Sequence, residues 1–154
     1  MKKIFLFFIS LFVFLACDGY NTNFPPPTAE MKLQQVFPES LGKYPRKGIK
    51  AMNPNKQKAF LAVYGESDAS IQLIVLASHN DANLYFKKFI VPEIDNLKNH
   101  SRGKVNGKWF GKGKGPNKEL HYRWVNDKYI FAIQAKDKET FAVVVDGFSY
   151  IAKK

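Results

Sequence analysis

The only cysteine in this 154-residue chain is Cys17, and it follows directly on an apolar leader. The chain opens with two lysines after its first residue, residues 4–16 carry a single polar side chain, and the small Ala16 precedes the cysteine. A positive start, a short apolar run and a small residue are the parts of an export signal. Because one cysteine cannot form a disulfide within the chain, an exported fold of this sequence has to be stabilised by a hydrophobic core.

Two other readings of the leader are a membrane-spanning helix and a plain secretory signal. Residues 4–16 would form a helix of about 20 Å, which is short against roughly 30 Å of hydrocarbon. A plain secretory signal leaves the unpaired cysteine unexplained. The four residues Phe14-Leu15-Ala16-Cys17 resemble the lipobox of bacterial lipoproteins, although Phe14 stands where that pattern commonly has leucine. The resemblance implies cleavage after residue 16 and attachment of a diacylglyceryl group to the thiol of Cys17.

Three segments follow from this reading. Residues 1–16 are the signal peptide, and residues 17–32 are the lipidated cysteine and a tether that contains three consecutive prolines. Residues 33–154 are long enough for one domain with its own core. We expect a membrane-anchored protein of the cell envelope, and the sequence leaves open whether it resides at the inner or the outer membrane.

The charge of the mature chain suggests its partners. Without residues 1–16 the chain has 22 basic and 13 acidic residues, a net charge of +9. An exported basic protein meets anionic lipid, lipopolysaccharide or cell-wall polymer before it meets any nucleic acid, so we expect no nucleic-acid partner. An envelope protein is a further possible partner.

Alternating apolar patterns predict an antiparallel sheet. We expect a hairpin from residues 59–64 and 71–76, and a three-stranded meander from residues 108–115, 119–125 and 128–135. Residues 33–41 are expected to form a short helix or packed segment, and the basic segment 43–58 to be mostly loop.

Two helices complete the expected fold. Residues 80–98 place their apolar side chains on one helical stripe, with Asn80 or Asp81 as cap and a kink or restart at Pro92. Residues 140–152 form either a helix or a hairpin, and the helical phase of their apolar residues favours the helix, capped by Asp137. The sequence therefore predicts an α+β fold, a hairpin plus a three-stranded meander with about two helices on one face.

Lysine and glycine alternate in the segment 108–115. If Pro116 and Asn117 form a two-residue turn, Trp109, Gly111 and Gly113 lie opposite large side chains of the next strand, and the other face is rich in lysine. That face is a candidate anion-binding surface, made of Lys104, Lys108, Lys112, Lys114 and Arg123. Alternatively, these lysines only solvate the strand and discourage edge-to-edge association.

No motif predicts catalytic residues, metal ligands or a cofactor. The chain lacks the Gly-x-Ser-x-Gly elbow, and the lysine-glycine run lacks the spacing of a phosphate-binding loop. His79, His100 and His121 are not spaced as zinc ligands, and no nucleophile can be named for His121. The leading hypothesis is a lipid-anchored envelope lipoprotein that acts as a non-catalytic binding or accessory module for an anionic envelope ligand. The alternatives are a small periplasmic hydrolase and a structural subunit of an envelope complex.

Overall fold

The computed structural model describes residues 19–154, so the leader and the predicted lipidation of Cys17 lie outside the described residues. In chain order the elements are β1 (Tyr20–Asn21), α1 (Leu33–Val36), β2 (Ser40–Leu41), β3 (Tyr44–Met52), the 3-10 turn η1 (Pro54–Lys56), β4 (Lys58–Tyr64), β5 (Ala69–Val75), α2 (His79–Tyr85), the π-helical turn η2 (Phe86–Ile90), α3 (Val91–Asp95), β6 (Lys98–Val105), β7 (Lys108–Lys114), β8 (Leu120–Asn126), β9 (Tyr129–Ala135), α4 (Lys138–Gly147) and β10 (Ala152–Lys153).

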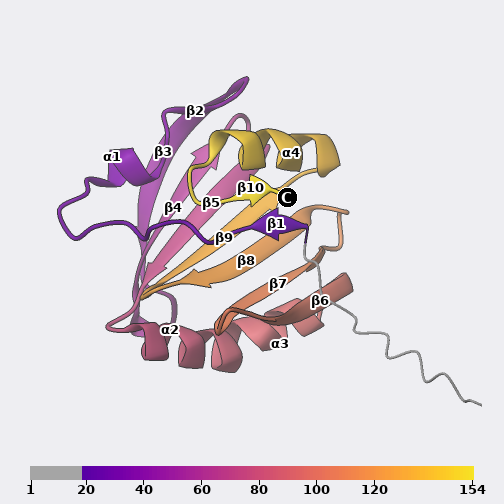
Figure 1. Ribbon diagram of the computed structural model, residues 1–154. Helices are drawn as coiled ribbons and strands as arrows, with labels where there is room; N and C mark the ends of the chain where they lie inside the picture. Colours follow the sequence, from indigo (N-terminus) through magenta and orange to yellow (C-terminus); the bar gives the residue numbers. More distant parts are fainter. Residues whose placement is uncertain (1–18) are drawn as a thin grey trace, which may run out of the picture.

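The main sheet has eight strands in the order β2-β3-β4-β5-β9-β8-β7-β6, and its neighbours are antiparallel (Figure 1). The predicted hairpin is β4–β5 and the predicted meander is β7–β8–β9. Pairing of β5 with β9 joins the two into one sheet. The α+β class with an antiparallel sheet is confirmed, but the sheet is larger than the sequence predicts.

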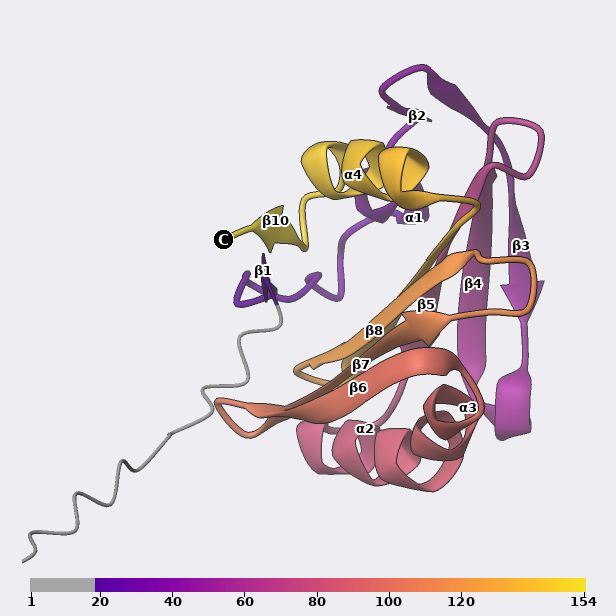
Figure 2. The same ribbon diagram turned by 90° about the vertical axis from the view of Figure 1, so that its right-hand side faces the viewer.

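The helices cover both faces of the sheet, so the expectation that they share one face is wrong. Figure 2 shows α4 with β1 and β10 on one side, and α2 with α3 on the other. On the α4 side, Trp124 and Phe131 pack against Phe148. On the other side, Val125 and Ile130 belong to a second buried cluster with Phe86. Strands β8 and β9 carry apolar residues on both faces, and each face therefore needs its own cover.

The two long strands that the sequence analysis missed lie at or near the edges of the main sheet, and the two-residue strands β1, β2 and β10 were also not predicted. Strand β3 occupies most of the segment 43–58 that was expected to be loop, and β6 takes the basic segment just before the meander. Their side chains are mostly exposed, so neither strand needs the apolar alternation that reveals a buried one. Basic residues at sheet edges also hinder pairing with other chains.

The turn between β7 and β8 has three residues rather than two. Gly115 N–H donates to Glu119 O (2.9 Å), Lys118 N–H donates to Gly115 O (3.1 Å), and Lys118 has a φ of 68°. This is the three-residue hairpin geometry with its last residue in the left-handed region. The extra residue shifts the pairing by one, so that Phe110 lies opposite Trp124 and Gly111 lies opposite Arg123.

A one-residue shift exchanges the faces of β7 relative to β8. Lys108, Phe110, Lys112 and Lys114 thus share the face of Tyr122 and Trp124, and the two glycines lie on the face of His121 and Arg123. The aromatic set on β8 and β9 is confirmed as core, but Trp109 does not belong to it. Gly111 instead leaves room for Ile94 of α3, and Gly113 leaves room for Leu97, which follows that helix.

The long helical segment begins at His79, one residue before the predicted segment, and neither of the predicted caps, Asn80 and Asp81, is its N-cap. Ser78 is its N-cap, and its hydroxyl accepts a hydrogen bond from Asp81 N (3.1 Å). Before Pro92 the helix widens into the π turn, in which Val91 N–H donates to Phe86 O. A proline has no N–H for the usual helical bond and crowds the carbonyl four residues earlier, and a π turn is one of the irregularities at which helices depart from regular geometry.

The last helix, α4, is confirmed, with Asp137 as its N-cap. The Asp137 carboxylate accepts a hydrogen bond from Thr140 N (2.8 Å). Phe141, Val144 and Val145 are buried from the helix itself. The apolar phase continues past its end, because Phe148 and Ile151 are also buried.

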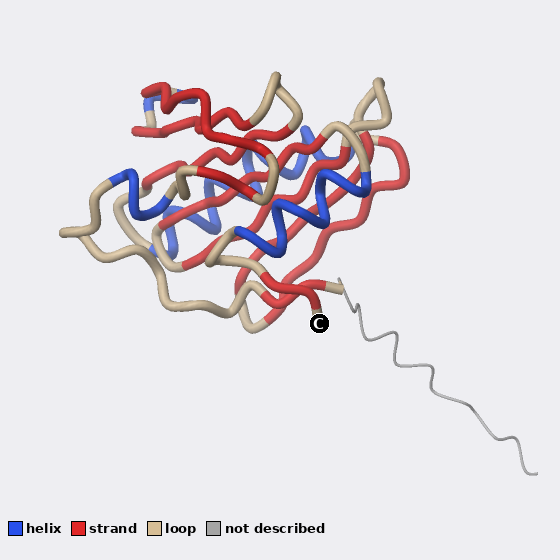
Figure 3. The backbone as a smooth tube through the Cα atoms, turned by 90° about the horizontal axis from the view of Figure 1, so that it is seen from above, coloured by secondary structure: helices blue, strands red, loops and turns tan. Residues whose placement is uncertain are grey.

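Residues 20–32 lie against the domain, although the sequence analysis assigns them to a tether. Strand β1 pairs with β10 at the other end of the chain, and Gly19 O accepts a hydrogen bond from Lys154 N (3.1 Å). The Tyr20 ring packs edge-on against Tyr122 (5.1 Å between centroids), and Asn126 donates to Phe24 O (3.1 Å). Seen from above, the described chain therefore begins beside its C-terminus (Figure 3).

Candidate anion-binding face

Strand β1 lies over β7 and β8 and separates two hollows. Both hollows are lined in part by Tyr20, whose ring is wedged between Tyr122 and Phe141, with centroids 5.1 and 5.5 Å away. The two-stranded sheet of β1 and β10 is therefore fixed to the main domain by an aromatic cluster. Basic residues gather on both sides of it.

The first hollow has a volume of about 180 Å³. Lys112 and Lys114 line it together with Asn99 and the rings of Tyr20, Tyr122 and Phe141. Rings beside ammonium groups make a surface suited to an anion that also carries an apolar or aromatic part.

The second hollow has a volume of about 250 Å³ and lies between residues 20–23 and the β6–β7 turn. Lys108 and Lys154 line it, and Lys108 Nζ donates to Asn23 Oδ1 (3.2 Å). Lys153, which pairs with Tyr20 across the small sheet, is exposed nearby. We use the term basic face for these five lysines, which are Lys108, Lys112, Lys114, Lys153 and Lys154.

Only three of the five predicted anion-binding residues belong to this face. Lys104 lies on the opposite side of the sheet, with its Nζ 5.1 Å from the centre of the Trp109 ring. Arg123 is also on that side and is ion-paired with Glu93 of α3. The change of side follows from the register shift, because Arg123 lies opposite Gly111 rather than beside the lysines.

Lys153 and Lys154 are the members that the sequence analysis missed. The sequence shows two lysines at its end, but no local pattern predicts that they lie beside residues 19–20. That proximity depends on the pairing of β1 with β10, which joins opposite ends of the chain.

The pairing of β6 with β7 adds a repulsive contact at the margin of the basic face. Lys98 and Lys114 are direct cross-strand partners, and both are exposed. Like charges opposite each other destabilise a sheet. The stability of the sheet alone therefore does not favour two lysines at these positions.

His121 lines the first hollow and lies beside Glu119. Its side chain is 13% exposed, and its Nε2 is 3.5 Å from Glu119 Oε1. Burial and the nearby Arg123 charge lower the pKa of His121, and Glu119 acts in the opposite direction without prevailing. The carboxylate of Glu119 is the side-chain partner of this imidazole.

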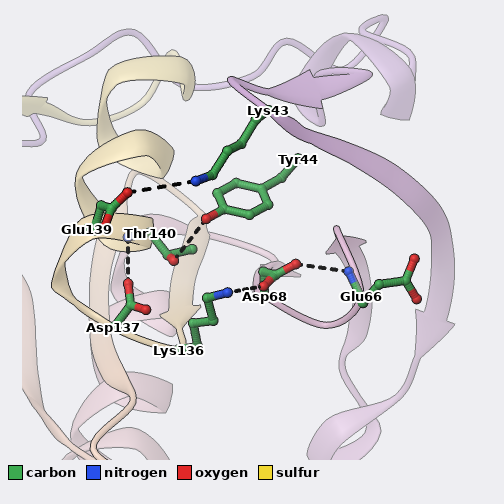
Figure 4. A network of polar contacts seen from close by, with 8 residues as sticks. All are labelled: Lys43, Tyr44, Glu66, Asp68, Lys136, Asp137, Glu139 and Thr140. Atoms are coloured by element: carbon green, nitrogen blue, oxygen red, sulfur yellow. Dashed lines mark hydrogen bonds and ion pairs between the residues drawn. The ribbon is translucent and has the colours of Figure 1, made fainter.

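A second polar cluster joins β3, the β4–β5 turn and the start of α4 (Figure 4). Lys136 is paired with Asp68, and the Tyr44 hydroxyl lies 3.2 Å from Thr140 Oγ1. The hydrogen bond from Lys136 holds the pKa of Asp68 below its usual value, and that from Thr140 N does the same for the pKa of Asp137. Because these charged groups and the helix cap are paired with one another, we infer that the cluster stabilises the fold.

The lysine-glycine run at residues 111–115 does not form a phosphate-binding loop. Residues 111–114 belong to β7 and pair with β8 on one side and β6 on the other. Backbone N–H groups that bond to neighbouring strands cannot also cradle a phosphate. Within residues 19–154, no group of three or more histidine, cysteine, aspartate or glutamate side chains is placed to hold a metal ion. No helix formed by these residues is long and apolar enough to cross a membrane.

Comparison with known proteins yields the fold and no more. No family model matches the chain, and no match was found among curated proteins. Among solved structures, a protein described as a GTP binding regulator from Thermotoga maritima has a similar fold, with a TM-score of 0.59. The similarity covers 84% of this chain and 95% of that one, at 14% sequence identity. At that identity the likeness establishes shared architecture alone.

Proposed function

We propose that this chain is a lipid-anchored protein of the cell envelope that acts as a non-catalytic binding or accessory module for an anionic envelope ligand. The observation that carries the proposal is the position of four lysines in the two hollows beside β1, with Lys153 paired to Tyr20. Strand β1 begins three residues after Cys17. The resemblance of the leader to a lipobox supplies the anchor. The ligands that fit are anionic lipid, lipopolysaccharide or cell-wall polymer.

The size of the electrostatic effect supports such a role. One lysine near an anionic membrane contributes about 1 kcal/mol, and the attraction fades over a Debye length of about 8 Å at physiological salt. Five lysines on one face therefore act together only at a close-by anionic surface. The same reasoning predicts binding that weakens steeply as salt rises.

The two alternatives have less support. A hydrolase needs a nucleophile, and His121 faces Glu119 instead. A structural subunit would present a large apolar patch. Among the described residues, the large apolar side chains that are exposed are Met52, Leu84 and Val105, which lie on β3, α2 and β6.

Nucleotide binding is suggested only by the description of the Thermotoga maritima protein. The chain segment that comes nearest to a phosphate loop is a paired strand, so we do not extend that description to this chain.

The test is salt-dependent binding of residues 17–154 with Cys17→Ser, so that no anchor contributes. The chain is mixed with phosphatidylcholine vesicles, with vesicles that also contain phosphatidylglycerol, and with cell-wall fragments. Lys108, Lys112 and Lys114 changed to Glu should abolish binding to the anionic partner, and a cooperative melting curve should show that the variant is folded.

The matched control changes Lys50, Lys58 and Lys87 to Glu, which alters net charge equally on β3, β4 and the π turn. That control should retain most of the binding. If both triple variants lose binding equally, net charge and not the basic face is responsible. If the unmodified chain ignores every anionic surface at low salt, the binding role is wrong.

A further inference from the structure

We propose that the basic face rests on the anionic headgroups of the same bilayer that holds Cys17, so that the domain has one fixed side toward the membrane. This inference rests on the proposed function and specifies its partner. The surface meets a phospholipid bilayer rather than a soluble anion. The argument uses the place where the described chain begins, the charge around that place, and the position of the other basic residues.

The chain leaves the domain inside the basic face. Gly19 is hydrogen-bonded to Lys154, and Tyr20 is held by Lys153 of β10 and by the Tyr122 ring. Tyr20 is the third residue after Cys17, and an extended chain spans at most about 3.6 Å per residue. Tyr20 is therefore no more than about 11 Å from the residue that carries the acyl chains.

A tether free from residue 17 to residue 32 would have allowed the domain to stand far from the bilayer and to rotate. Residues 20–24 remove that freedom, because they pair with β10 and pack on Tyr122 and Asn126. The anchor and the basic face are consequently held at nearly the same height above the membrane. The limit of about 11 Å between Cys17 and Tyr20 is comparable with the Debye length, so the lysines beside Tyr20 lie within reach of the headgroup charge.

The five lysines outnumber the acids near the basic face, which include Glu119, Asp146 and Asp18. Asp146 lines a neighbouring hollow together with Lys153, and Asp18 precedes the described residues. The hydrogen bond from Lys108 to Asn23 and the pairing of Lys153 hold part of the basic face in place. A surface with its positive groups held in position suits a planar layer of phosphates better than a single small ion.

Two exposed lysines, Lys50 and Lys87, lie away from the basic face. Strand β3, with the exposed Lys50, is five strand spacings from β7, or roughly 24 Å at about 4.8 Å each. Lys87 belongs to the helical layer on the opposite face of the sheet (Figure 2). Docking of the basic face therefore leaves Lys50 and Lys87 exposed to solution, and they serve as internal controls.

The test attaches residues 17–154 to vesicles through the thiol of Cys17, the only cysteine in the chain, by reaction with a maleimide-bearing lipid. One set of vesicles contains phosphatidylcholine, and the other also contains phosphatidylglycerol. A membrane-impermeant amine reagent then labels the lysines, and peptide mass spectrometry gives the labelling rate of each. We expect the five lysines of the basic face to react several-fold more slowly on anionic than on neutral vesicles, and Lys50 and Lys87 to react equally on both.

A variant reports the same interaction independently. With Lys108, Lys112 and Lys114 changed to Glu, the protection of Lys153 and Lys154 on anionic vesicles should disappear. Equal rates for the unmodified chain on both vesicle types would overturn the inference, as would slowing at Lys50 in place of the basic face. A further experiment adds inorganic phosphate to the chain on neutral vesicles, to test whether a soluble anion slows the labelling of the same lysines. Equal protection by phosphate alone would also overturn the inference.

The two proposals fail separately in this design. Because the linkage to the vesicle is chemical, the result does not depend on whether the cell attaches acyl chains to Cys17. An unmodified Cys17 in cells would contradict the lipid anchor in the proposed function, whereas absent protection would contradict only the membrane-facing orientation.

Discussion

Gly111 of β7 lies directly under the side chain of Ile94 from α3, with no room for a Cβ between them. Gly113 has the same relationship to Leu97, whose Cβ would be 2.6 Å from an added Cβ. The two glycines thus allow the end of the long helix to approach the sheet. This contact fixes α3 over β7 and orders the start of β6, which follows directly.

We therefore expect Gly111→Val to destabilise the domain by about 1–3 kcal/mol, through overpacking against Ile94. Urea unfolding measures the change. Gly48→Val is the control, since nothing lies within 4 Å of a Cβ at that position in β3. Similar stability of the two variants would show that α3 does not approach β7 as described.

Asp137→Ala should lower the free energy of unfolding by about 1 kcal/mol, because it removes the acceptor for Thr140 N at the start of α4. Asp137→Asn keeps an acceptor and should lose much less. Both values come from the same urea titrations. An equal loss in the two variants would mean that the negative charge, and not the cap, stabilises the helix.

The lowered pKa of His121 predicts a loss of stability in mild acid. The folded state binds the proton less readily than the unfolded state, so this contribution is fully present above the ordinary histidine pKa of about 6.5. It is lost as pH falls through the lower pKa of the folded state. His121→Gln should flatten the dependence of stability on pH in that window. A dependence that survives His121→Gln contradicts the assignment.

Relief of the repulsion between Lys98 and Lys114 should stabilise the sheet. Either Lys98→Glu or Lys114→Glu should raise the free energy of unfolding by about 0.2–1 kcal/mol, and the double variant should lose that gain. High salt should reduce the differences. Additive effects in this double-mutant cycle would show that the two side chains do not face each other.

Residues 58–75 and 108–135 illustrate what the sequence can reveal. Strands with apolar alternation and a helix with an apolar stripe were predictable, because burial imposes those periods. Strands β3 and β6 were not, because strands with exposed side chains need no such pattern. The register of β7 depended on whether Lys118 adopts a left-handed backbone, which is an uncommon choice for lysine.

The candidate site was predictable only in part, for the same physical reason. Lys108, Lys112 and Lys114 share a face because alternate residues of a strand must do so. Their association with Lys153 and Lys154 depends on β1 meeting β10, a contact between opposite ends of the chain. Arg123 was assigned to the wrong face because a one-residue error in register moves every side chain of a strand.

The most direct measurement is mass spectrometry of the N-terminal peptide of the mature protein purified from membranes. If the chain is a lipid-anchored envelope protein, the peptide begins at Cys17 and carries acyl chains, and Cys17→Ala leaves the precursor uncleaved. A mature chain that begins elsewhere, or that begins at Cys17 with an unmodified thiol, would contradict the account.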